Sequence, residues 1–96
     1  MIVKMNWGIL GLMFRSRCDV PIIFPGTRTI HMIGVSFPID ILFLDKYFKV
    51  IDKCDNLWAW KGVYHSNARG IQHVIESNAG DFKKIKVGDK IEIKYI

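Results

Sequence analysis

The longest apolar stretch of the chain runs from Thr29 to Asp45, and its side chains alternate as they do in a β-strand. One face would carry Phe37, Ile39, Ile41 and Phe43, and the other Asp40, Leu42 and Leu44. A strand that is apolar on both faces must be covered on both sides, as in a closed barrel or a sandwich. Asp40 interrupts the run, and burying a bare carboxylate costs several kcal/mol or more. Asp40 is therefore predicted to be either a structural anchor or part of a site.

Shorter apolar or alternating segments predict the other strands. These segments are Ile2–Val3, Ile22–Phe24, Phe48–Ile51, Ile71–Ser77 and Lys90–Ile96. A helix is predicted over Asn6–Phe14 and a single helical turn over Asp81–Lys84, whereas residues 52–67 are expected to form mainly a long loop. Many short strands with little helix predict a mostly β fold at the α+β border. We expect a small barrel-like or sandwich domain with one or two short helices.

The length of 96 residues predicts a single domain, residues 1–96. Half of the residues are hydrophobic, which argues against a disordered chain. No run approaches the ~20 apolar residues that span a bilayer, so no transmembrane segment is predicted. Trp7–Phe14 follows Lys4 and imitates a short secretion signal, but no small-residue cleavage site follows it. The cytoplasm is the default location.

The chain carries 14 basic and 9 acidic residues, a net charge of +5. A positive net charge of this size can bind phosphate-bearing partners weakly, but a basic surface that keeps the protein soluble is the simpler explanation. Nucleic-acid binding is therefore open and not favoured. Cys18 and Cys54 form no Cys-x-x-Cys pair, so both are expected to be reduced. Neither stands at ligand spacing from a histidine, so we predict no metal site and no cofactor.

Two polar constellations have a structural and a functional interpretation. Arg15 could bind an anionic ligand, or it could pair with a buried carboxylate, Asp40 or Glu76. His31 is most simply a core or rim residue. The alternative is an acid/base pair of His31 with Asp40, which would need a bend in the chain to bring the two together.

The segment around Trp58 and Trp60 is rich in lysine and aromatic residues. An exposed Trp beside lysines could stack on a base or a sugar. The structural interpretation is that one Trp closes the end of the barrel.

Several short motifs occur in an order that resembles a known family. The motifs are Gly11–Arg15, Phe24–Pro25, Ile30–Met32, Phe37–Asp40, Phe43–Asp45, Val74–Glu76, Ala79–Gly80 and Ile85–Asp89. Over roughly residues 9–94 the chain resembles the domain-of-unknown-function family 192, and in particular its archaeal-type members. The resemblance implies a compact, mostly β, barrel-like fold. It supplies no activity, and it weakens the cytoplasmic assignment because many members carry an export signal.

The chain departs from the family pattern at Ile33-Gly34 and at Ser36, where relatives often carry polar, aromatic or basic residues. If those groups formed a reaction centre, this chain lacks them, which argues against an enzyme. We therefore expect a small non-enzymatic binding module, a monomer or weak homo-oligomer, whose ligand is a small molecule or a protein. Its site would be lined by Arg15, His31, Met32, Asp40, Trp60 and Glu76. The alternatives are a small hydrolase that uses His31 and Asp40, and a weak nucleic-acid-binding barrel.

Overall fold

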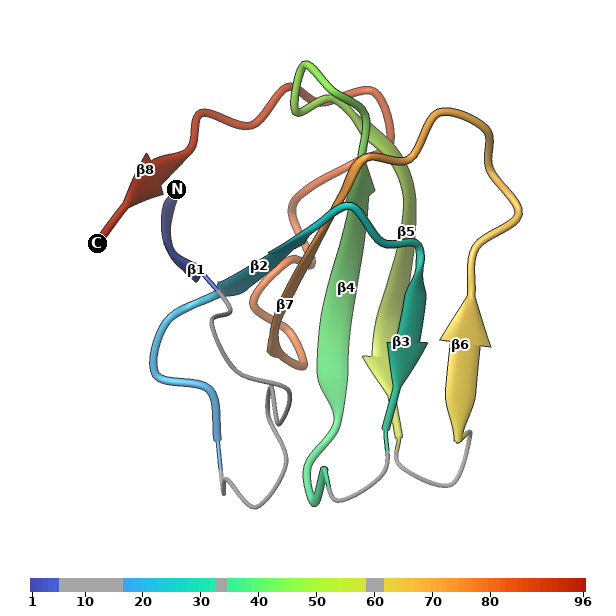
Figure 1. Ribbon diagram of the computed structural model, residues 1–96. Helices are drawn as coiled ribbons and strands as arrows, with labels where there is room; N and C mark the ends of the chain where they lie inside the picture. The colour runs from blue at the N-terminus through green and yellow to red at the C-terminus, as the bar shows by residue number, and fades with distance from the viewer. Residues whose placement is uncertain (6–16, 33–34, 59–61) are drawn as a thin grey trace.

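The computed structural model describes residues 1–5, 17–32, 35–58 and 62–96, which form two β-sheets (Figure 1). The strands are β1 (Ile2–Met5), β2 (Ile22–Pro25), β3 (Thr29–His31), β4 (Ile39–Leu44), β5 (Val50–Leu57), β6 (Val63–His65), β7 (His73–Asn78) and β8 (Lys94–Tyr95). The larger sheet has the order β5-β4-β7-β2-β1-β8, and β3 pairs with β6 in the smaller sheet. The strand β1 runs parallel to both of its neighbours, and the other pairs are antiparallel.

The strand β4 lies inside the larger sheet, and all six of its residues are buried. One face of β4 packs against an inter-sheet layer that contains Ile30 of β3 and Tyr64 of β6. The other face packs against an outer layer that contains Phe82 and Ile91. Because each face has its own apolar cover, the strand can be hydrophobic at successive positions. The predicted alternation and the predicted cover on both sides are therefore confirmed.

The predicted mostly β class is confirmed, but the sheets are not closed into a barrel. The larger sheet has open edges at β5 and β8, and β3 and β6 form a separate sheet. Closure is not needed to cover β4, because the smaller sheet lies over one face and the segment around Phe82 over the other (Figure 1).

The expectation of a long loop over residues 52–67 was wrong, because β5 and β6 occupy most of that segment. The backbone of β5 pairs with β4 along its length, and this pairing does not depend on the polarity of the side chains. Two irregularities in the β4–β5 register also break the alternation that would have marked a strand, and Asn56 has a positive φ of 57° there.

The predicted helical turn over Asp81–Lys84 is instead a series of tight turns, closed by bonds such as Lys83 N–H to the Gly80 carbonyl at 3.3 Å. The predicted Asn6–Phe14 helix lies outside the described residues. The last strand is shorter than predicted, because only Lys94–Tyr95 and an isolated bridge between Lys49 and Lys90 are paired. In the described part of the chain, no helix is long and apolar enough to cross a membrane.

Candidate binding site on the larger sheet

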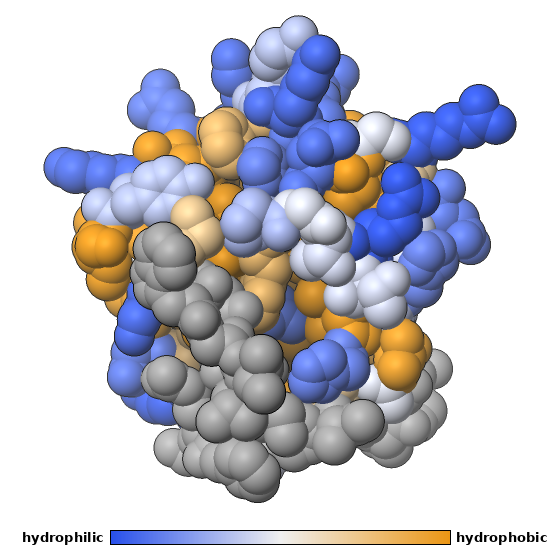
Figure 2. Space-filling view, in the orientation of Figure 1, coloured by the Kyte–Doolittle hydropathy of each residue, from blue (hydrophilic) through white to orange (hydrophobic). Residues whose placement is uncertain are grey.

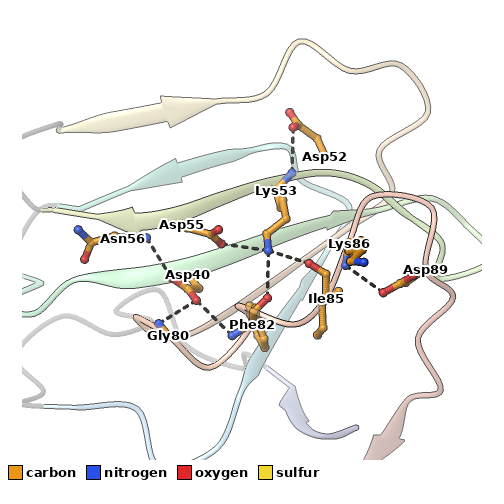
Figure 3. A network of polar contacts seen from close by, with 10 residues as sticks. All are labelled: Asp40, Asp52, Lys53, Asp55, Asn56, Gly80, Phe82, Ile85, Lys86 and Asp89. Carbon is orange, nitrogen blue, oxygen red and sulfur yellow. Dashed lines mark hydrogen bonds and ion pairs between the residues drawn. The ribbon is translucent and has the colours of Figure 1, made fainter.

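Asp40 at the start of β4 is 1% exposed, and its carboxylate accepts three backbone hydrogen bonds. The donors are the N–H groups of Asn56 at 2.9 Å, Gly80 at 2.9 Å and Phe82 at 3.1 Å (Figure 3). Three donors compensate for much of the water that the buried carboxylate has lost. Of the two roles predicted for Asp40, the geometry matches the structural anchor, which fastens the turn after β7 to β4 and β5.

Lys53 of β5 holds the same turn as a hydrogen-bond donor, whereas Asp40 holds it as an acceptor. Its ammonium donates to the carbonyl oxygens of Phe82 at 3.0 Å and Ile85 at 2.8 Å, and it lies 3.2 Å from the Asp55 carboxylate. Asp40 accepts hydrogen bonds from N–H groups of the turn, and Lys53 donates hydrogen bonds to its carbonyl oxygens, so both kinds of backbone polar group in this turn find a partner (Figure 3).

Glu76 of β7 is a second buried carboxyl-bearing residue. It differs from Asp40 in the face of the sheet on which it lies and in its lack of hydrogen-bond donors among the described residues. It is 4% exposed and extends from the other face of the sheet, into the inter-sheet layer with Val74. Among the described residues, none donates a hydrogen bond to its carboxyl or forms an ion pair with it. Burial raises the pKa of Glu76 to about 8. At pH 7 this group is therefore mostly a neutral acid that can both donate and accept a hydrogen bond.

Glu76 belongs to a row of residues that lie opposite one another on adjacent strands. The strand register places Lys4, Ile22, Glu76, Ile41 and Cys54 in this order across β1, β2, β7, β4 and β5. Adjacent strands are about 4.8 Å apart, so Lys4 and Glu76 flank Ile22 at about 10 Å from each other. Both side chains are long enough to reach a group that lies over Ile22.

A small pocket of about 50 Å³ opens beside Ile22 at the Lys4 end of this row. Its wall is the segment from Cys18 to Val20, and the Asn78 side chain fixes this wall. The Asn78 amide accepts a bond from the Cys18 N–H at 2.8 Å and donates to the Cys18 carbonyl at 2.7 Å. Asn78 thus acts like an extra strand residue, and it holds the wall next to the strand that carries Glu76.

The other end of the row is formed by Cys54, which is not a reactive thiol. Cys54 and Tyr64 of β6 are both partly buried in the inter-sheet layer, and burial raises the pKa of the thiol and of the phenol. Neither Cys18 nor Cys54 forms a disulfide. A thiol with a raised pKa is a poor nucleophile, so Cys54 offers no reaction centre. Within the ranges that the structure describes, no group of three or more His, Cys, Asp and Glu side chains could hold a metal ion.

The structure does not bring the predicted site residues together as one cluster. Met32 is fully buried in the inter-sheet layer, and His31 is exposed on the outward face of β3. Asp40 points to the opposite side of the larger sheet, so the whole inter-sheet layer separates it from His31. No hydrogen bond between these two side chains exists in the described part of the chain, and the placement gives the predicted acid/base pair no support.

Arg15 and Trp60 lie outside the described residues, and so do the predicted contact of Arg15 with Asp40 or Glu76 and the predicted role of Trp60. The remaining candidate, Glu76, is buried in the inter-sheet layer and receives no hydrogen bond from the described residues. The sequence analysis missed Lys4, Cys18 and Asn78 as its neighbours. Only Asn78 carried a signal, since a polar residue directly after an apolar strand can bond to a neighbouring backbone.

The architecture and this site define a class: a small, mostly β, two-sheet domain with a buried carboxyl group in the larger sheet that has no partner among the described residues. The model of the family described as "Uncharacterized ACR", domain of unknown function 192, matches residues 8–93. The chain belongs to this family, as the order of its motifs predicted. No curated protein matches it.

Two solved structures are similar to the chain. The first is a protein of unknown function from Novosphingobium aromaticivorans, with a TM-score of 0.76, 25% identity, and coverage of 94% of this chain and 71% of that one. The second is a protein from Sinorhizobium meliloti, provisionally assigned as a transcription regulator, with a TM-score of 0.69, 26% identity, and coverage of 95% and 79%.

Proposed function

We propose that the protein is a small binding module whose ligand lies over Ile22, between Glu76 and Lys4. The observation that carries the proposal is the carboxyl group of Glu76, a residue that is 4% exposed and has no partner among the described residues. A buried polar group without a partner is costly, and strongly perturbed carboxyl groups are concentrated at functional sites. A ligand that completes the hydrogen bonding of Glu76 would remove this cost.

The two polar ends of the site favour a ligand with an oxygen acceptor. With a pKa raised to about 8, Glu76 keeps its proton at pH 7 and donates an O–H, and Lys4 supplies a positive charge. The pocket of about 50 Å³ has room for a group the size of one or two water molecules. A carbonyl or a carboxylate at the end of a small molecule fits these properties, and an ammonium group does not.

The experiment that tests this proposal is an amide-resolved NMR titration at pH 6.5 with acetate as the acceptor probe and methylammonium as the donor probe. Acetate is expected to shift the amide resonances of Ile22, Glu76 and Ile41, and methylammonium is expected to leave them unchanged. The acetate effect should disappear as the pH rises past the pKa of Glu76, because the ionised carboxyl has no proton to donate.

Matched variants assign the effect to the site. Glu76→Gln keeps a donor in the same place, so it should bind acetate with no pH dependence between pH 6 and pH 9. Glu76→Leu should abolish the shifts, and Glu92→Gln, which makes the same exchange at an exposed position, should leave them intact. Binding of acetate to Glu76→Leu, or preferential binding of methylammonium to the unaltered protein, would contradict the proposal.

A further inference from the structure

A separate open groove lies at the end of the molecule where β4 leads into β5. It is lined by apolar and aromatic side chains together with Lys90 and Glu92. The aromatic and aliphatic lining residues are Tyr47, Phe48, Ile91, Ile93 and Tyr95. Neither Lys4 nor Glu76 contributes to it, so it is distinct from the site over Ile22.

The aromatic rings of the groove are available to a partner. Tyr47 is 63% exposed and Tyr95 is 49% exposed, although tyrosine rings normally bury most of their surface when they serve the core. Phe48 is held in place because its ring stacks on His73, with 4.8 Å between the centroids and an interplanar angle of 17°. The groove therefore offers two exposed rings beside one ring that is fixed from behind.

The two walls of the groove are tied to each other. The Ile91 N–H donates to the Phe48 carbonyl at 2.9 Å, and the Val50 N–H donates to the Asp89 carbonyl at 2.8 Å. On the far side, the Lys94 N–H donates to the Met1 carbonyl at 2.9 Å. The rings are thus mounted on backbone that is paired before any partner arrives, which lowers the ordering cost of binding.

Lysines outnumber acidic residues in the two segments that form this groove. Residues 45–49 and 90–96 carry four lysines and two acidic residues. Lys46 holds its ammonium 5.1 Å from the centroid of the Tyr47 ring, so a charge and an aromatic face share the rim. Figure 2 shows long hydrophilic side chains that project from this end of the molecule, with apolar surface between them.

We propose that this groove binds single-stranded nucleic acid, with bases stacked on Tyr47 and Tyr95 and phosphates held by the surrounding lysines. Exposed rings next to lysines match the alternation of planar bases and anionic phosphates along a single strand. The groove is open and most of its lining is apolar or aromatic, so it can follow a flexible strand without reading individual bases. Binding should therefore depend little on base sequence and strongly on salt.

The test is a fluorescence-anisotropy titration of the full chain with a labelled oligothymidylate at several salt concentrations. Contacts from three or four lysines predict a slope of log K against log salt of about −2 to −3. The double variant Tyr47→Ala/Tyr95→Ala should lose about 10-fold or more in affinity and keep the same slope, because it removes stacking and no charge. Lys90→Gln/Lys94→Gln should instead make the slope shallower by about 1.4.

A matched control removes the same charge elsewhere. Arg28→Gln/Arg69→Gln takes away two positive charges outside the groove, and it should leave the tyrosine-dependent affinity unchanged. Both tyrosines are exposed, so circular dichroism should show an intact fold in their variants. Equal losses in the control and in the lysine variant would overturn the proposal. So would competition by poly-L-glutamate as strong as that by oligothymidylate, which would assign the groove to acidic polypeptides.

Discussion

The two buried carboxyl groups of the larger sheet, Asp40 and Glu76, are placed on opposite faces and have opposite surroundings. Asp40 is 1% exposed and receives three backbone N–H groups, whereas Glu76 is 4% exposed and receives no bond from the described residues. Their burial is nearly equal, so burial alone does not decide what a carboxyl group does. The number of donors around it separates an anchor of the fold from a group that is available to a ligand.

The largest effect on stability is expected when the Asp40 carboxylate is removed. Asp40→Ala should lower the free energy of unfolding by about 4 kcal/mol, because three backbone donors lose a charged acceptor inside the protein. Urea denaturation at pH 7 measures this loss. Asp40→Asn keeps one acceptor oxygen and should lose about half as much. A loss below 1 kcal/mol for Asp40→Ala would show that the turn after β7 is held by other contacts.

Glu76, the other residue of the comparison, should destabilise the fold as the pH rises. Burial raises the pKa of Glu76 from 4.5 to about 8, so between these values the folded state keeps a proton that the unfolded state releases. The contribution of Glu76 is therefore complete below pH 4.5 and decreases as the pH rises through about 8. At about 1.4 kcal/mol for each unit of pKa shift, the loss reaches about 3 kcal/mol by pH 7.

Glu76→Gln does not titrate, so it should match the unaltered protein near pH 4 and exceed it by about 3 kcal/mol at pH 7. Urea denaturation at a series of pH values measures the difference. A difference that stays constant with pH would mean that Glu76 titrates normally and that its burial is relieved in solution.

The lysine that supports the anchor gives the next smaller effect. Lys53→Met should destabilise the fold by about 2 kcal/mol, because it leaves the Phe82 and Ile85 carbonyls without their ammonium donor. A double-mutant cycle with Asp40→Ala tests whether the two residues act on one turn. The combined loss should be smaller than the sum, since either variant already releases the segment. Strict additivity would show that they fasten independent parts.

Asp55 should matter least, although it lies 3.2 Å from the Lys53 ammonium. Its side chain is 54% exposed, and exposed ion pairs contribute little. Asp55→Ala should change the free energy of unfolding by less than about 0.5 kcal/mol, again measured by urea denaturation. A loss as large as that of Lys53→Met would place the strength of this cluster in the ion pair and not in the backbone carbonyls.

The sequence was sufficient to predict the architecture where the side-chain pattern is set by burial. The alternation of Ile39, Ile41 and Phe43 with Leu42 and Leu44 follows from covers on both faces of β4. The predicted strand Phe48–Ile51 contained only the start of β5, and the remainder was taken for a loop because its side chains are largely polar and its pairing uses the backbone. The open edges could not be predicted, because the same alternation serves a barrel and a sandwich.

The candidate site was harder to predict, because it depends on which strands become neighbours. Lys4, Ile22 and Glu76 are far apart in the sequence, and they meet only through the order β7-β2-β1 and a particular register. The two roles of Asp40 were both visible in the sequence. The hydrogen bonds from Gly80 and Phe82 to Asp40 favour the anchor, and no local sequence pattern predicts that these residues return to the start of β4.

The strand order β5-β4-β7-β2-β1-β8 also has a kinetic consequence. The pairings β4 with β7, β2 with β7 and β1 with β8 all join segments that are distant in the sequence, so long loops must close before these contacts stabilise anything. Refolding is therefore expected on the millisecond-to-second timescale of non-local β topologies, with the β4–β5 hairpin as a local unit that can assemble early.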